Sequence, residues 1–238
     1  QVTHDYFAEN GCVASDHGVE TPYAYQIDEA DADRVFRKAL QNAEELTGNE
    51  IVAFMSYVLN EVAEMDAAKG WVFQLHMGAV RDARDMLYDQ IGPDTGGDIS
   101  DHLTDTVTPL LPLLNRFDER LEIVLYNLNP VHTAALAHLT RAFGSKVNLG
   151  AAWWLNDSYI GMKRQLESIG TVDLLMNLAG MVSDSRKLLS YASRHEVFRR
   201  TLADVVGTMV DRGQMPMPLA ERLMRQLSYD RPKALFGL

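Results

Sequence analysis

The 238-residue chain is long enough for one large domain with a sizeable core. Its 22 basic and 33 acidic side chains give a net charge of −11 without a basic stripe, which argues against nucleic acid and anionic membrane surfaces as partners. The single cysteine, Cys12, excludes an intrachain disulfide. Because no apolar run is long enough to cross a membrane and residues 1–5 lack a signal-peptide pattern, we expect a cytoplasmic protein.

The first 70 residues are predicted to contain helices and one short strand. The strand is the apolar run 11–15, closed by Asp16 and His17. Thr47 and Glu50 have the spacing of a capping box, which opens a helix. Helical spacing of apolar residues predicts helices over residues 28–47 and 47–70, after the last turn of an earlier helix at 5–7.

Strands then alternate with helices, and each strand ends on polar or aromatic residues. The predicted strands are 71–76, 122–126 and 147–152, and the predicted helices are 110–117, 131–143 and a segment through Met162, Leu166 and Ile169. The intervening loop 91–98 is rich in Gly, Pro and Asp, which is typical of a binding loop or of a surface Ω-loop.

A fifth strand is predicted to begin at Gly180 and to end at Ser183-Asp184-Ser185-Arg186. In an α/β barrel, such a strand would deliver Asp184 and Arg186 to the carboxyl-end mouth, where active sites lie. The alternative is that Asp184 and Arg186 are a solvated loop pair.

The remaining residues are predicted to be helical. Ser193 and Glu196 have capping-box spacing and predict a helix start, and the helical segment 199–230 is interrupted at 213–218. Strands that alternate with helices indicate an α/β fold of parallel β/α units. Five strands alone cannot close an eight-stranded barrel.

Six stretches form an ordered set of motifs. They are GCVASDHG (11–18), QLHMGA (74–79), IGPDTG (91–96), YNLNP (126–130), WWLND (153–157) and the run 183–200. In order and spacing this set resembles the uronate isomerases, the glucuronate isomerase branch of the amidohydrolase superfamily. The tryptophan pair and the last run are its most specific parts.

The resemblance implies a TIM-type (β/α)8 barrel of the amidohydrolase superfamily. The five strands would be barrel strands four to eight, so the chain is expected to be the C-terminal portion of a single barrel domain in a longer protein. Within residues 1–238, a helical insertion is expected at about 22–68 and a C-terminal helical extension at about 199–238.

The implied activity is an aldose–ketose isomerisation of D-glucuronate to D-fructuronate and of D-galacturonate to D-tagaturonate. A proton must move from C2 to C1 through an enediol, which requires a base such as a carboxylate beside the sugar. Asp184, which matches the family's strand-eight aspartate, is the candidate base, either alone or with a group from the missing N-terminal segment. Arg186, two residues later in the matching motif, is the candidate group for the substrate carboxylate or its neighbouring hydroxyls.

Further candidates come from the other motifs. Trp153 corresponds to the family's active-site tryptophan and would stack on the sugar with Trp154 beside it, unless Trp153 is only a core residue and Trp154 the lid. Asp16 and His17 are expected to orient the open-chain sugar. The helix residues Arg194 and His195 also match the family, and a structural role is an equally good interpretation for them.

The metal-ligand pattern of the superfamily is incomplete in this chain. The sequence has no His-x-His, and its seven histidines are scattered. Asp184 and His76 match ligand positions on barrel strands eight and five, although a hydrogen bond within the barrel rim would equally explain His76. At most one divalent metal such as zinc is expected, which the reaction need not require, and no organic cofactor. A homo-oligomer that binds a small hexuronate is expected.

Two alternatives remain open. One is a metal-dependent hydrolase of the same superfamily, which would need a tightly held zinc. The other is a non-catalytic half-barrel that is completed by another polypeptide, because an open sheet edge recruits a partner or aggregates.

Overall fold

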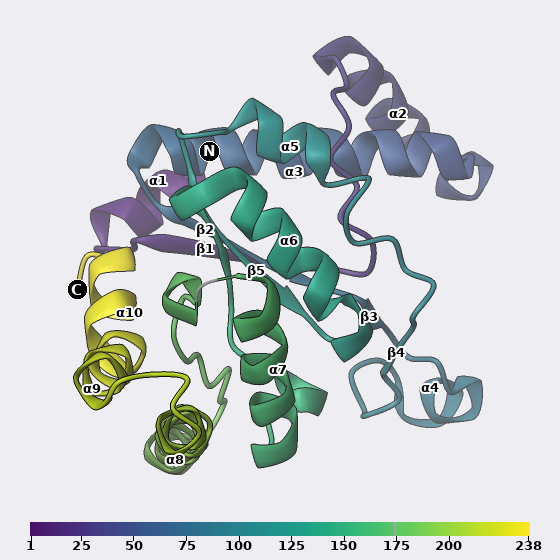
Figure 1. The fold of residues 1–238 in the computed structure, drawn as a ribbon. Coiled ribbons are helices and arrows are strands. Elements are labelled where there is room, and N and C mark those ends of the chain that lie inside the picture. Colours follow the sequence, from purple (N-terminus) through teal and green to yellow (C-terminus); the bar gives the residue numbers. More distant parts are fainter. Residues whose placement is uncertain (174) are drawn as a thin grey trace.

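The computed structural model describes residues 1–173 and 175–238. Its main sheet has four parallel strands in the order β1-β2-β5-β6, of which β1, β2 and β5 are labelled in Figure 1. The strands are β1 (Ala14–Val19), β2 (Val72–Met77), β5 (Glu122–Asn127) and β6 (Val147–Leu149). Helices lie between consecutive parallel strands, so the predicted α/β fold with a parallel sheet is confirmed.

Helices pack against one face of this sheet. The larger core cluster joins Phe73, Leu75, Ile123 and Leu125 of the strands to apolar residues of six helices. Those helices are α3 (Gly48–Lys69), α5 (Leu111–Arg116), α6 (Thr133–Phe143), α7 (Tyr159–Val172), α8 (Leu188–Asp211) and α9 (Met217–Arg225). The alternate strand residues therefore point away from these helices, toward the opposite, inner face.

Smaller elements complete the described chain (Figure 1). They are α1 (Val2–Glu9), α2 (Glu29–Asn42), α4 (Asp85–Ile91), α10 (Arg231–Leu235), the hairpin of β3 (Ala79–Val80) and β4 (Ile99–Ser100), a π-helical turn at Gln226–Asp230, and 3-10 turns at Ala43–Glu45, Pro130–His132, Gly144–Lys146, Trp154–Asn156 and Leu175–Asn177. None of the helices in the described ranges is long and apolar enough for a bilayer crossing.

The first predicted capping box is confirmed at the start of α3. The Thr47 hydroxyl accepts from the Glu50 amide at 3.3 Å, and the Glu50 carboxylate accepts from the Thr47 amide at 2.9 Å. Gly70 ends the helix in the left-handed conformation, with φ of 67°. The helix boundaries predicted from Thr47 and Gly70 are therefore correct.

The second predicted capping box is wrong. Helix α8 begins at Leu188, so Ser193 and Glu196 lie inside it. The Ser193 hydroxyl donates to the Ser190 carbonyl at 3.1 Å, and Glu196 pairs with Arg199 and Arg200. Both side chains thus make contacts within the helix instead of capping its first turn.

The strand prediction that begins at Gly180 is also wrong. At that edge of the sheet the described chain makes one parallel bridge, between Leu149 and Leu178, and the Ala179 amide donates to the Leu149 carbonyl at 2.9 Å. Gly180 then turns the chain with φ of 99°, and a Cβ there would lie 2.9 Å from the Pro232 ring. The chain leaves the sheet at Gly180 because the C-terminal helix packs against that position.

Two further strand boundaries differ from prediction. β1 covers Ala14–Val19 instead of residues 11–15, so Asp16 and His17 lie within the strand. β6 ends at Leu149 instead of 152; Gly150 still donates its amide to the Leu125 carbonyl at 2.8 Å before the chain bends away.

Candidate active site

Four inner-face side chains form a polar layer between the middle and the carboxyl ends of the strands. We define this inner polar layer as Asp16, Gln74, His76 and Tyr126, which the strand register brings together. His76 lies flat on the Tyr126 ring, with centroids 4.1 Å apart and an interplanar angle of 5°. His76 Nδ1 is 2.7 Å from Asp16 Oδ1, and the Tyr126 hydroxyl donates to Gln74 Oε1 at 2.9 Å. Burial raises the pKa of the Tyr126 hydroxyl, with a smaller contribution from Asp16, so this group remains a neutral donor.

Trp153 connects this layer to Asp184. The indole is 6% exposed and meets the His76 ring edge-on, with centroids 4.5 Å apart at 63°. Its Nε1–H donates to Asp184 Oδ2 at 2.9 Å. Among the described residues this is the one hydrogen bond of the Asp184 side chain, so Trp153 orients the carboxylate and leaves Oδ1 available.

Asp184 and Arg186 line one cavity of about 280 Å³, together with Arg81, Asp94, Gly96, Asp98, Trp153 and Trp154. Both the Asp184 and the Arg186 side chains are exposed to solvent. The structure therefore brings three carboxylates, two guanidinium groups and two indoles around a space that a small polar ligand could enter.

Backbone strain is concentrated around this cavity. Five non-glycine residues have positive φ, and four of them border the cavity or its loop: Asp82 at 50°, Asp94 at 59°, Trp154 at 49° and Asp184 at 44°. Aspartate tolerates this conformation, whereas for a bulky tryptophan it costs on the order of 1–3 kcal/mol. Such strain is typical of functional sites, because the surrounding structure must hold it in place.

Arg81 is a cavity residue that the sequence did not single out. Its guanidinium lies 5.2 Å from the centroid of the Trp154 ring, and its Nη1 is 2.9 Å from Asp98 Oδ2. Arg81 and Trp153 also line an adjacent cavity of about 200 Å³ with Glu20 and His76. A cation between two cavities fits the binding of a ligand carboxylate.

His17 lies on the opposite face of β1, away from the inner polar layer. It stacks on Phe73 at 4.9 Å, and its Nε2 is 2.9 Å from the Ser15 hydroxyl, which in turn bonds to the buried Asp66. Asp66 also pairs with His4 at 2.7 Å. His17 therefore lies apart from Asp184 and Arg186. Asp16 is linked to Asp184 only through the contacts of His76 and Trp153.

The burial of His17 predicts a loss of stability in acid. Burial lowers the pKa of His17 from its usual value near 6.5, although Asp66 and Asp16 partly oppose this and His4 adds to it. Because the unfolded chain then binds the proton more readily, stability should fall as pH drops below about 6.5 and through the folded-state pKa.

Thermal unfolding between pH 7.5 and 5 should therefore show a smaller loss of Tm in His17→Gln than in the unmutated chain. The loss should not vanish, because burial also lowers the pKa of His195. His102→Gln is the matched control, since the His102 side chain is 74% exposed. An acid-induced loss that is identical in His17→Gln and the unmutated chain would contradict this account.

A family model described as glucuronate isomerase matches residues 1–236. The chain belongs to the glucuronate isomerase family. The uronate isomerase of Thermotoga petrophila is 49% identical over 98% of this chain and 51% of its own length. The chain thus spans about half the length of the curated relatives that it matches.

Solved structures of the glucuronate isomerase family agree with the fold. The crystal structure of uronate isomerase from Thermotoga maritima has a TM-score of 0.95 and 48% identity, covering 99% of this chain and 52% of that one. The glucuronate isomerase of Caulobacter crescentus has a TM-score of 0.91 and 30% identity, covering 99% and 49%.

The two candidate metal ligands of this family member do not form a complete metal site within the described residues. No group of three or more His, Cys, Asp or Glu side chains gathers there in a geometry that could hold a metal. His76 Nε2 is buried without a partner among the described residues, whereas its Nδ1 contacts Asp16 and Asp184 accepts from Trp153. His76 and Asp184 would need further ligands to hold a divalent metal.

Arg194 and His195 lie within α8, outside the inner polar layer. Arg194 pairs with Asp157, whose side chain is 4% exposed, and so ties α8 to the turn that follows the tryptophan pair. Arg194 therefore makes a contact between two elements and lines neither cavity beside Asp184.

Proposed function

We propose that this chain carries part of the active site of a uronate isomerase, which interconverts D-glucuronate with D-fructuronate and D-galacturonate with D-tagaturonate. The observation that carries the proposal is Asp184, held by Trp153 in a cavity that Arg186 and Arg81 also line. The Asp184 carboxylate matches the acidic proton at C2, and the Arg186 guanidinium, which has no ion pair in the described chain, matches the substrate carboxylate; Arg81 is already paired with Asp98.

Asp184 is the proposed base. It takes the proton from C2 while the C1 aldehyde oxygen gains a proton, which gives the enediol. Delivery of a proton to C1 and loss of the proton on the C2 hydroxyl then give the ketose, so no oxidant or reductant is consumed. The hydrogen bond from Trp153 fixes the carboxylate in one orientation during both transfers.

Binding is assigned to the groups around Asp184. Arg186 holds the substrate carboxylate as a bidentate guanidinium partner, and Arg81 supports it or an adjacent hydroxyl. Trp154 covers the sugar, and its ring is already fixed by Arg81 at 5.2 Å. Asp16 and His76 of the inner polar layer hydrogen-bond the sugar hydroxyls.

We further propose that the parallel sheet is part of a (β/α)8 barrel, in which β1, β2, β5 and β6 are strands four to seven. Residues 22–68 would then be a helical insertion and residues 199–238 an extension of that domain. A homo-oligomer is proposed on the same family grounds.

The activity is tested by proton NMR of D-glucuronate in heavy water. Ketose signals should appear and the C2 proton signal should disappear when this chain, or the longest gene product that contains it, is added. Hydrolysis of an amide or ester without this exchange would favour a metal-dependent hydrolase. A folded gene product with neither activity would contradict the catalytic proposal.

Replacing Arg186 with Lys is expected to raise KM for D-glucuronate roughly tenfold or more with a smaller change in kcat, because Lys cannot form the bidentate contact. Steady-state kinetics measure both constants. Arg199→Lys is the control, since Arg199 pairs with Glu196 on α8 and does not line the cavity. An unchanged KM in Arg186→Lys would remove Arg186 from carboxylate binding.

A further inference from the structure

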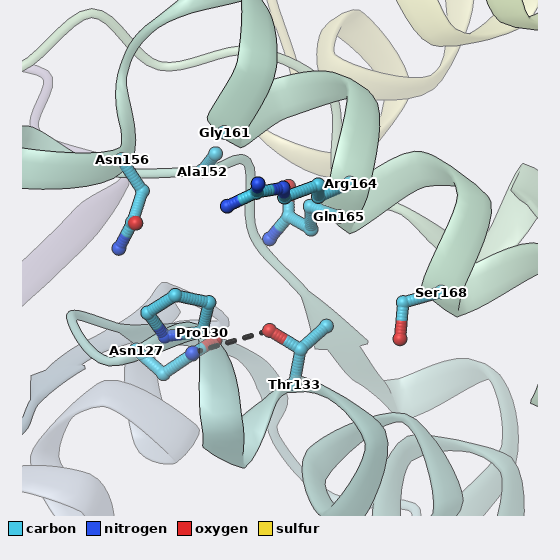
Figure 2. A pocket seen from close by; sticks show the side chains of 9 residues that line it. All are labelled: Asn127, Pro130, Thr133, Ala152, Asn156, Gly161, Arg164, Gln165 and Ser168. Atoms are coloured by element: carbon cyan, nitrogen blue, oxygen red, sulfur yellow. Dashed lines mark hydrogen bonds between the residues drawn. The ribbon is translucent and has the colours of Figure 1, made fainter. Parts of the chain in front are cut away.

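A separate cavity of about 220 Å³ lies between the turn that follows β5 and the first half of α7 (Figure 2). Its polar lining consists of Asn127, Thr133, Asn156, Arg164, Gln165 and Ser168. None of its lining residues also lines either cavity beside Asp184. Ala152 faces this cavity while the next residue, Trp153, faces the other two, so this segment is the wall between them.

Charge in this cavity favours an anion. Arg164 is its one charged lining residue, and Figure 2 shows the guanidinium extending over the hollow toward Asn156. No ion pair of Arg164 occurs in the described part of the chain, and no carboxylate lines the cavity. Arg164 is exposed to solvent at the rim of the cavity, and a guanidinium that has no ion pair in a protein with a net charge of −11 favours a negatively charged ligand.

The hydrogen-bonding groups of the cavity favour a ligand that carries hydrogen-bond donors. The side-chain amide nitrogens of Asn127 and Gln165 already donate, to the Asn129 carbonyl at 2.7 Å and the Gly150 carbonyl at 3.0 Å. Both residues line the cavity, and their amide oxygens make no hydrogen bond in the described ranges, although neither oxygen is among the buried unpaired atoms. Amide oxygens that are open to a cavity can accept from ligand hydroxyl groups, so a ligand with hydroxyl groups suits this site better than a bare inorganic anion.

We propose that this cavity is a second binding site, specific for a small polyhydroxy monocarboxylate. The carboxylate pairs with Arg164, and ligand hydroxyls donate to Asn127 and Gln165 and exchange hydrogen bonds with Thr133 and Ser168. The volume of about 220 Å³ is below the roughly 300–1,000 Å³ of sites for drug-sized ligands, which limits the ligand to a small metabolite. A ligand here contacts the wall that carries Trp153 and Trp154, and can therefore influence the catalytic cavity.

The test is a titration of the ¹⁵N-labelled protein followed by NMR of its side-chain amides. D-gluconate is the main probe, with D-glucitol as the uncharged polyol and inorganic phosphate as the anion without carbon-bound hydroxyls. Gluconate has no aldehyde or ketone group to isomerise, so it is not turned over, and the Asn127 and Gln165 amide signals report binding in this cavity whether or not the catalytic proposal is correct. We expect saturable shifts of the Asn127 and Gln165 amide signals with gluconate, and weaker binding of both other probes.

Arg164→Gln should weaken gluconate binding roughly tenfold or more, whereas Arg141→Gln should leave it unchanged. Arg141 is an exposed residue of α6 without an ion pair in the described chain, which makes it the matched control. In Arg186→Gln, which changes the cavity beside Asp184, the Asn127 and Gln165 amide signals should still shift when gluconate is added. If circular dichroism shows that Arg164→Gln does not fold, Ser168→Val is used in its place, because the larger side chain narrows the cavity.

Three results would overturn the proposal. Wild-type affinity for gluconate in Arg164→Gln would remove the charge pairing. Equal affinity for glucitol would show that no anion is selected, and binding of phosphate alone would show an inorganic anion site in place of one for a hydroxy acid.

Discussion

Replacing Asp184 with Asn is expected to lower turnover of D-glucuronate by roughly 10²- to 10⁴-fold, the range that a positioned general base contributes. Asparagine tolerates the left-handed backbone conformation that Asp184 adopts, with φ of 44°, and its side-chain oxygen can still accept from Trp153. The variant therefore keeps the local structure and removes only the negative charge and the basicity. The loss should appear in kcat and in the exchange of the C2 proton, measured by NMR in heavy water.

Asp94→Asn is the matched control for this prediction. Asp94 lines the same cavity and also has positive φ, but it lies 3.8 Å from Arg81 and makes no described contact with Trp153. Its effect should remain within a few-fold. Full activity in Asp184→Asn would assign the base to another residue, and equal losses in both variants would indicate a general effect of cavity charge.

Part of the candidate site could be predicted from the residues that follow the apolar runs of the sequence. Carboxyl ends of parallel strands meet at one edge of a sheet, so the polar residues after each apolar run were expected to lie together. His76, Trp153 and Asp184 are joined by direct contacts, as this rule suggests. Their chemical roles remain predictions.

The position of His17 could not be predicted, because a small shift in strand boundaries decides which face a residue occupies. Once β1 includes both Asp16 and His17, alternation sends them to opposite faces. The missing strand at Gly180 has a similar cause, since the Pro232 ring that packs there is 52 residues away in sequence. Neither packing partner is visible in a local pattern.

Arg81 was missed for a related reason. It follows the QLHMGA motif and precedes a helix, and nothing in its neighbours distinguishes it from a surface residue. Asp98 lies 2.9 Å from Arg81 because the loop after α4 folds back toward Arg81. The Trp154 ring lies beside Arg81 because Trp154 adopts a backbone conformation with positive φ. Loop residues of this kind are defined by tertiary contacts.

The second large effect is expected at Gly150, the residue that supports Tyr126. A Cβ at this position would overlap the Tyr126 ring, and the backbone cannot move away freely. The Gly150 amide donates to Leu125 at 2.8 Å, while its carbonyl accepts from Gln165 at 3.0 Å. Gly150→Ala must therefore displace the ring from His76, to which it is stacked at 4.1 Å, and should destabilise the protein by about 1–3 kcal/mol or more.

Urea denaturation measures this cost, and Gly207→Ala is the control. Gly207 lies in α8 with nothing within 4 Å of its would-be Cβ, so alanine there should stabilise the helix by about 0.4–1 kcal/mol. Combining Gly150→Ala with Tyr126→Leu should cost less than the sum of the two single changes, because the smaller side chain vacates the space that the new methyl needs. If the free-energy costs of the two single changes simply add in the double variant, the cost of Gly150→Ala does not come from overlap with the Tyr126 ring. The stacking of Tyr126 on His76 would then not depend on glycine at position 150.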